Sequence, residues 1–223
     1  MLNLNHWIRD YVHLGRGVIR EIIYRKPPKH YLGYVEADKP PIILIPGIFE
    51  TWRFLKHLAD FLSLRGYPIY VIEDLKHNHR PIPESAHTVR KFIEEKNLRD
   101  VIIIAHSKGG LIGKFILAFL NDDKRVRKMI AIATPFGGSR ITRIIPLKPI
   151  RELSPESSII GKLRQHAEVN GNILSIYGVF DNHVWPVESC RLEGAQNIQL
   201  PEHGHHAILA SKKLQGIILE TLR

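Results

Sequence analysis

From residue 40 onward, short runs of β-branched and other apolar residues alternate with stretches in which apolar residues recur every three or four positions. The short runs predict strands that are buried on both faces, and the longer stretches predict amphipathic helices. The predicted strands cover residues 41–46, 68–73, 100–105, 128–133, 172–178 and 197–200. The predicted helices cover residues 51–65, 84–97, 109–121 and 207–222. We therefore expect an α/β fold with a doubly wound, mostly parallel sheet of about six strands.

The first 35 residues form a basic amphipathic helical segment that precedes a single domain over residues 36–223. Its apolar positions approximate one helical face: Ile8, Tyr11, Val12, Gly15, Ile19, Ile22 and Ile23. Its arginines lie mostly off that face: Arg9, Arg16, Arg20 and Arg25. We expect this helix to pack against the domain, and docking onto an anionic membrane surface is the alternative.

Residues 136–171 are too long for an ordinary connection between strands, so we expect a lid-like excursion over the site. Within it, Ser154 is expected to cap a helix whose first residue is Pro155. Several apolar residues could line an acyl pocket or simply pack the excursion onto the core: Ile144, Ile145, Leu147, Ile150 and Leu153.

The most informative motif is Ala105-His106-Ser107-Lys108-Gly109, which joins a predicted strand directly to a predicted helix. A serine at such a corner has a strained backbone that brings its neighbours close together, so the small residues Ala105 and Gly109 fit the turn. The following helix would offer backbone N–H groups and the positive end of its dipole beside the hydroxyl. This motif predicts a nucleophile elbow.

In these residues the chain resembles the lipase and esterase branch of the α/β-hydrolase superfamily, and the resemblance covers most of residues 40–215. Two departures from the family pattern are Ala105 in place of the first elbow glycine and Pro46 in place of a histidine before Gly47. The resemblance implies that the N–H groups of Ile48 and Lys108 form the oxyanion hole.

The acid and the base also follow from this resemblance. The family pattern G-x-x-D-x-x-V-x-P is matched by residues 178–186 and implies that Asp181 is the acid, with Glu188, Glu193 and Asp74 as weaker substitutes. The pattern H-x-x-L-L-x-S is similar to residues 205–211 and favours His205 as the base, ahead of His206 and His203. The chain order Ser, Asp, His agrees with the fold.

Composition changes this picture little. The net charge of +10 could attract an anionic surface, but the basic residues are spread along the chain without a nucleic-acid-binding signature, so nucleic acid is an unlikely partner. The histidine clusters 77–79 and 203–206 lack the register of a dinuclear site, so we expect no metal and no other cofactor. The sequence does not determine the oligomeric state.

The single cysteine, Cys190, is expected to be structural. Because one cysteine cannot form a disulfide within the chain, the composition favours a cytoplasmic setting. The first residues carry charges where a signal peptide needs an apolar run, and no later run is long enough to span a bilayer. We therefore expect a cytoplasmic protein, with peripheral membrane contact as the alternative.

Together the motifs predict a serine hydrolase that cleaves carboxylic esters through an acyl-enzyme, with an acyl ester or lipid as substrate. Two alternatives stay open. The same three residues could pass the acyl group to an acceptor other than water, or the chain could be a catalytically silent α/β-hydrolase that binds a ligand.

Overall fold

The predicted fold class is confirmed. The computed structural model describes residues 4–145 and 147–222, and in this part of the chain six parallel strands form one sheet in the order β2-β1-β3-β4-β5-β6. The strands are β1 (Ile42–Ile45), β2 (Ile69–Val71), β3 (Val101–His106), β4 (Val126–Ile132), β5 (Ile173–Phe180) and β6 (Gln196–His203). The strand order reverses direction between β1 and β3, and ligands of open α/β sheets bind beyond the carboxyl ends of the strands at such a switch point.

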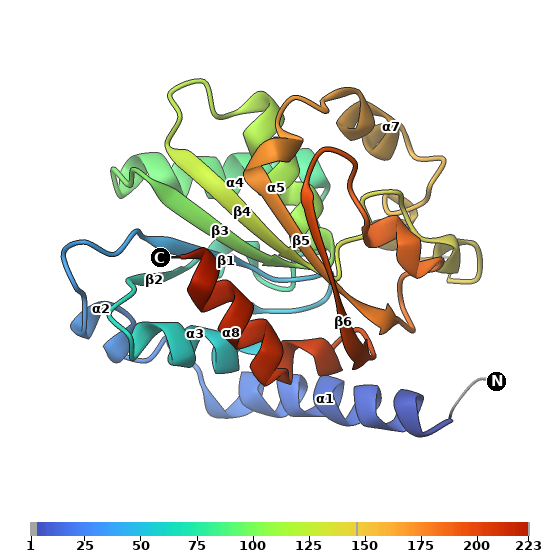
Figure 1. Cartoon of the computed structure of the whole chain (residues 1–223), viewed down its shortest axis with the longest axis horizontal. Coiled ribbons are helices and arrows are strands. Elements are labelled where there is room, and N and C mark those ends of the chain that lie inside the picture. The colour runs from blue at the N-terminus through green and yellow to red at the C-terminus, as the bar shows by residue number, and fades with distance from the viewer. Residues whose placement is uncertain (1–3, 146, 223) are drawn as a thin grey trace.

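Helices cover both faces of the sheet (Figure 1). Helices α4 (Ile82–Glu95) and α5 (Lys108–Phe119) lie on one face, and α3 (Lys56–Ser63) and α8 (Lys212–Thr221) lie on the other. Outside that second layer runs α1 (Leu4–Ile23), which is followed by the short α2 (His30–Gly33). The excursion carries α6 (Lys148–Arg151) and α7 (Ser158–Gln165).

The central strand β1 shows why the sheet needs helices on both sides. Ile43 and Ile45 belong to the core that α4 and α5 cover, whereas Ile42 and Leu44 belong to the core under α3 and α8. All four side chains are fully buried. Because successive side chains of a strand point to opposite faces, a run that is apolar throughout is stable only between two helical layers.

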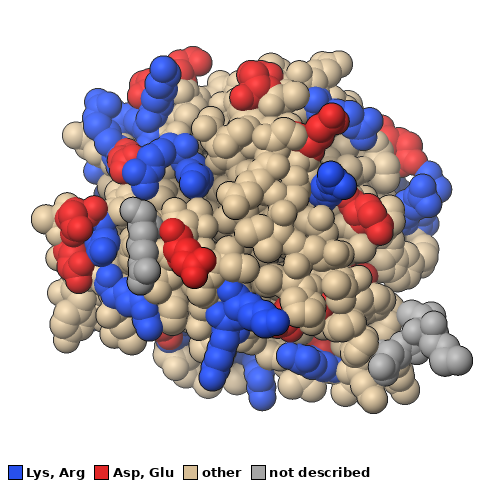
Figure 2. All heavy atoms as spheres, in the orientation of Figure 1, with Lys and Arg blue, Asp and Glu red and all other residues tan. Residues whose placement is uncertain are grey.

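Helix α1 packs on the domain with its polar side. Its buried residues are Asp10 and Gly17, and a Cβ on Gly17 would lie 2.4 Å from the ring of Phe54. The apolar side chains that the sequence pattern groups on one face are exposed: Ile8, Tyr11, Val12, Ile19, Ile22 and Ile23. Leu4 and Val18 of the same helix are exposed as well. Lys and Arg side chains also lie along the lower edge of the view in Figure 2, where Figure 1 places α1.

The excursion differs from its predicted form at one point. The prediction that Ser154 caps a helix starting at Pro155 is wrong, because those residues form a turn and α7 begins at Ser158. Ser157 is the cap, and its hydroxyl accepts the N–H of Ile160. The excursion is held on the domain by Leu153, which joins the core beside α4 and α5.

Candidate active site

Ser107 stands at the corner between β3 and α5, as the strand–turn–helix pattern predicts. Its φ of 52° and ψ of −123° lie in a region that residues other than glycine rarely adopt. Its N–H donates to the carbonyl of Ile132 at 2.8 Å, which ties the corner to the neighbouring strand β4. This geometry holds the side chain at the carboxyl edge of the sheet.

Gly109 is required at this corner by the approach of another backbone segment. A Cβ at this position would lie 2.3 Å from the carbonyl oxygen of Ile45, which belongs to β1 and cannot move aside. Ala105, two residues before the serine, is fully buried at the end of β3. The two small residues therefore allow β1 and the start of α5 to come into contact.

The loop after β1 lies beside the elbow. Gly47 donates its N–H to Glu50 Oε2 at 2.8 Å, and the Glu50 N–H donates back to the Gly47 carbonyl at 3.3 Å. Ile48 lies inside this turn and lines the same cavity as Ser107. Lys108 is the first residue of α5, a position whose N–H has no acceptor within the helix.

The Lys108 side chain points elsewhere. Its ammonium is buried and donates to the carbonyls of Asn78, at 3.2 Å, and Arg80. Burial lowers the pKa of Lys108 to about 8, although the carboxylate of Glu152 opposes this shift. Only the backbone N–H of Lys108 is therefore available to an oxyanion beside Ser107.

Asp181 and His205 are brought together from two different strands. Asp181 directly follows β5, His205 follows β6, and His205 Nδ1 lies 2.7 Å from Asp181 Oδ2. The other oxygen, Oδ1, accepts the N–H groups of His183 at 2.7 Å and Val184 at 2.8 Å. Burial by itself would raise the pKa of Asp181, but the charge and hydrogen bond of His205 together with these N–H donors lower it. These contacts favour the carboxylate form of Asp181 beside the imidazole.

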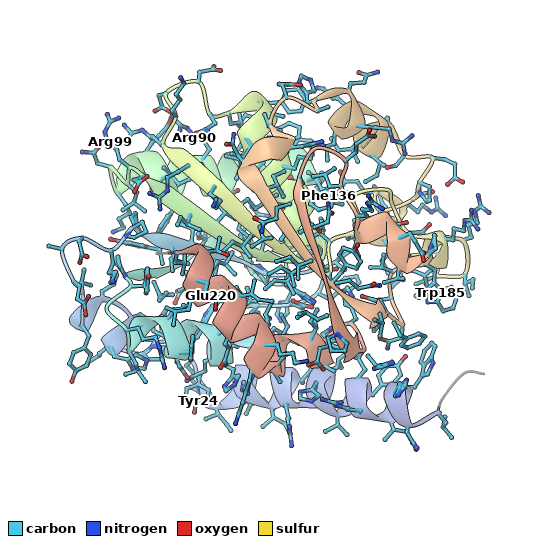
Figure 3. All side chains as sticks on the ribbon, in the orientation of Figure 1. Tyr24, Arg90, Arg99, Phe136, Trp185 and Glu220 are labelled. Carbon is cyan, nitrogen blue, oxygen red and sulfur yellow. The ribbon has the colours of Figure 1, made fainter. Side chains whose placement is uncertain are left out.

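Ser107 and His205 line one cavity of about 430 Å³. Its walls also include Ile145, Leu147, Ile150 and Leu153 of the excursion, so four of the five apolar residues considered for an acyl pocket reach it and Ile144 does not. No hydrogen bond joins the Ser107 hydroxyl to the His205 ring in the residues that the structure describes. Catalytic hydrogen bonds are often unformed before substrate binds. Figure 3 labels Trp185, which lies in the loop after Asp181, at the right of the view.

Relatives of known structure carry the same arrangement of elements. Lipase B of Aspergillus fumigatus matches 88% of this chain and 55% of its own length with a TM-score of 0.72 and 18% identity. Lipase BlEst2 of Bacillus licheniformis, in its mature form, matches 86% of this chain and 95% of its own length with a TM-score of 0.63 and 16% identity. The chain has the α/β-hydrolase fold.

Sequence comparison adds a relative of the same kind. A candidate esterase/lipase of Mycoplasma pneumoniae is 24% identical over 149 residues, which are 63% of this chain and 51% of that protein. The chain therefore spans about half the length of this relative. No family model matches the sequence.

Next to His205, a second histidine has a different set of partners. His206 Nδ1 lies 3.2 Å from Asp10 Oδ2, and its Nε2 lies 3.2 Å from Glu50 Oε1. Burial alone would lower the pKa of His206, but its two carboxylate partners raise it to about 9. Burial alone would likewise raise the pKa values of Asp10 and Glu50, yet their histidine partners lower both. His206 is therefore a buried imidazolium between two carboxylates, whereas His203 lies on β6 beside His6.

In the part of the chain that the structure describes, two groups of side chains lie close enough together to hold a metal ion: Asp10, His183 and His206, and Asp181, His183 and His205. In each group a carboxylate oxygen already contacts the Nδ1 atom of His206 or His205. A metal ion would have to displace the proton from that nitrogen. Among the described residues, the histidines at 77 and 79 belong to neither group.

The sequence patterns did not indicate Asp10, Asn182, His106 or the buried role of Glu50. The signal for Asp10 was weak: it is one of two acidic residues in a basic helix, and nothing in the spacing separates it from a solvated charge. The predicted structural role of Cys190 is confirmed, because the thiol is fully buried and burial raises its pKa.

Proposed function

We propose that this chain is a serine hydrolase that cleaves carboxylic esters, with Ser107 as nucleophile, His205 as base and Asp181 as the acid that orients it. The observation that supports this most is the buried Asp181–His205 pair, at 2.7 Å, because its histidine lines the same cavity as the strained Ser107. A hydroxyl, an imidazole and a buried carboxylate in this order are the groups that nucleophilic acyl transfer requires.

The proposed reaction has two halves. His205 takes the proton of Ser107 as the hydroxyl attacks the ester carbonyl, and Asp181 stabilises the imidazolium through Nδ1. The N–H groups of Ile48 and Lys108 then donate to the oxyanion, and the alcohol leaves with the proton from His205. In the second half, His205 takes a proton from water as the water attacks the acyl carbon; the ester bond to Ser107 then breaks, the carboxylic acid leaves, and the proton returns to the Ser107 hydroxyl.

A fluorophosphonate probe and a series of nitrophenyl esters from acetyl to palmitoyl test this proposal. We expect the probe to label the folded wild-type chain and Ser107→Ala to lose both labelling and turnover. Ser158→Ala is the matched control, because Ser158 is exposed at the start of α7 and does not line the cavity, so this variant should leave labelling intact. A folded chain that is neither labelled nor active would instead favour a silent ligand-binding module. Product analysis with an added alcohol would show whether the acyl group goes to an acceptor other than water.

We also propose that the substrate reaches the cavity from an anionic lipid surface on which α1 docks. The exposed apolar side of α1 continues into the cavity, because Val18 is both 45% exposed and part of the cavity wall. Phe49 and Leu147 share this property, at 44% and 49% exposure. An apolar stripe around a cavity mouth fits the interfacial layer of a bilayer.

The charges near this stripe favour anionic lipid over a neutral surface. Arg9, Arg16 and Arg25 are exposed, whereas the acidic residues of α1 are the buried Asp10 and the partly buried Glu21. The helix therefore presents cations beside its apolar side, as interfacial helices do. Among the described residues, no helix combines the length and apolar character needed to cross a bilayer.

Binding to vesicles with and without phosphatidylserine tests the lipid proposal. Ile22 is 74% exposed, so Ile22→Asn should weaken binding to anionic vesicles about tenfold by removing buried apolar surface. The control is Leu64→Asn, which alters a similarly exposed leucine just after α3. Added salt should weaken wild-type binding. Binding that is absent, or equal for neutral and anionic vesicles, would contradict the proposal.

A further inference from the structure

The buried carboxylate of Asp10 lies on the outermost helix of the molecule, yet its contacts are with the loop that carries Asp181 and with the loop that carries His205. Its Oδ1 accepts the N–H groups of His206 at 2.6 Å and Ala207 at 2.9 Å. Its Oδ2 accepts Asn182 Nδ2 at 2.9 Å and faces His206 Nδ1 at 3.2 Å. The side chain has no exposed surface.

These contacts surround the backbone of His205 on both sides. Asn182 links Asp10 to His205, because its Nδ2 donates to Asp10 and its Oδ1 accepts the N–H of His205 at 3.0 Å. On the other side, His206 contacts Glu50, Glu50 contacts His106 at 2.9 Å, and His106 Nε2 lies 3.1 Å from the His205 carbonyl oxygen. The peptide groups of His205 are thus held by side chains from three distant segments.

The residue before His205 is a glycine, which leaves room for the Asp10 carboxylate. Gly204 has a φ of +116°, and a Cβ there would lie 2.6 Å from Asp10 Oδ1. Any larger residue before His205 would be strained in this conformation and would push the carboxylate away. Gly17, the other buried residue of α1, allows equally close contact with the ring of Phe54.

We propose that Asp10 is a positioning residue for the base of this site: docked α1 holds the loop after β6 so that the His205 ring faces Ser107 and Asp181. The inference rests on the proposed hydrolase function and adds to it a control by the N-terminal helix. In Asp10→Asn the amide oxygen can still accept the two backbone N–H groups, but the NH2 group then faces Asn182 Nδ2 and the His206 imidazolium, so these buried donors lose their acceptor. Unpaired buried donors are costly, so the loop would move to reach water.

Steady-state kinetics on a short soluble ester, with the rate of fluorophosphonate labelling, tests the role of Asp10. We expect Asp10→Asn to lower kcat about 100-fold with little change in KM, because displacing a base by about 1 Å has effects of this size. Labelling should slow in parallel, and the pH profile of kcat/KM should shift because the neighbouring imidazolium loses its carboxylate. Glu21→Gln is the matched control, since Glu21 is on the same helix but contacts His77 instead of the loop.

A second variant covers the case in which Asp10→Asn does not fold. Asn182→Ala keeps the Asp10 carboxylate and its contacts with His206 and Ala207, removes the Asn182 contacts with Asp10 and with the His205 N–H, and should lower kcat about tenfold. Wild-type kcat in the folded variants would overturn the positioning role while leaving the hydrolase proposal intact. A change in thermal stability alone would also overturn it, since a merely structural contact would give that result. An inactive, unlabelled wild-type chain would overturn both proposals together.

Discussion

At the carboxyl edge of the sheet, short turns that directly follow strands line the cavity, whereas α1 reaches the same cavity from an outer layer of helix. Ser107 and Asp181 come within one residue of the ends of β3 and β5. Asp10 lies on a helix separated from the sheet by the layer of α3 and α8. The edge residues are placed by backbone hydrogen bonds of the sheet, whereas α1 is placed near the site by the side-chain contacts of the buried Asp10 and by the packing of Gly17 on Phe54. The two regions should therefore respond differently to single substitutions.

The largest effect is expected at the edge of the sheet. Asp181→Asn keeps the size of the side chain but replaces the acceptor that selects the tautomer of His205, so kcat should fall about 10⁴-fold. The effect of Asp10→Asn, which acts only through the backbone of the loop, should be about 100-fold smaller. The comparison uses kcat for one ester at one pH. Equal losses in the two variants would mean that both carboxylates act directly on the same ring.

The next effect is the dependence of stability on pH, which should originate at His206, the partner of Asp10 on α1. The folded state raises the pKa of His206 from 6.5 to about 9, so its contribution is complete below pH 6.5 and is lost as the pH rises through about 9. The corresponding free energy of unfolding is roughly 3 kcal/mol. Thermal unfolding followed between pH 6 and pH 9.5 should show this decline.

A variant assigns the decline to its source. His206→Gln cannot be protonated, so its stability should be lower at pH 6 and should change less as the pH rises. The other ionisable groups that face this ring are Asp10, Glu50, His106, His183 and His205. Asp10 has a lowered pKa and would weaken the network only as the solution becomes acidic, so it cannot mimic the alkaline decline. An unchanged pH dependence in His206→Gln would contradict this assignment.

A pair of glycines compares the two regions by packing alone. Gly109→Ala should destabilise the fold by about 3 kcal/mol or more, because its Cβ would meet a backbone carbonyl at 2.3 Å. Gly17→Ala should cost about 1 kcal/mol, since the Phe54 ring that it meets can turn aside. Gly15→Ala on the same helix meets nothing within 4 Å and should stabilise α1 by up to about 1 kcal/mol. Urea unfolding of the three variants gives the order, and a reversed order for Gly109 and Gly17 would contradict it.

These differences also explain what the sequence could predict. The six strands and the elbow could be predicted because apolar periodicity and small residues at a corner are local consequences of backbone geometry. The candidates Asp181 and His205 came from the resemblance to a family pattern and not from local backbone geometry. The partner of Asp10 could not be predicted, because the residues in contact are 172 to 197 positions apart and a lone aspartate in a basic helix looks like a surface charge. The apolar pattern of α1 also gave no indication that the polar side would pack inward.

The smallest effect is expected in a third region, which gives the baseline for the other two. On α4, Arg90 donates to both oxygens of Asp123, at 2.8 and 2.9 Å, and to Glu94 at 2.9 Å. Figure 3 shows Arg90 on the far side of the molecule from Tyr24, which follows the last residue of α1. These carboxylates are exposed, and exposed ion pairs contribute less than about 1 kcal/mol because water and salt screen them. Arg90→Ala should therefore lower the free energy of unfolding in urea by less than about 1 kcal/mol and leave kcat unchanged. A loss as large as that in His206→Gln would show that burial is not what distinguishes the network around Asp10.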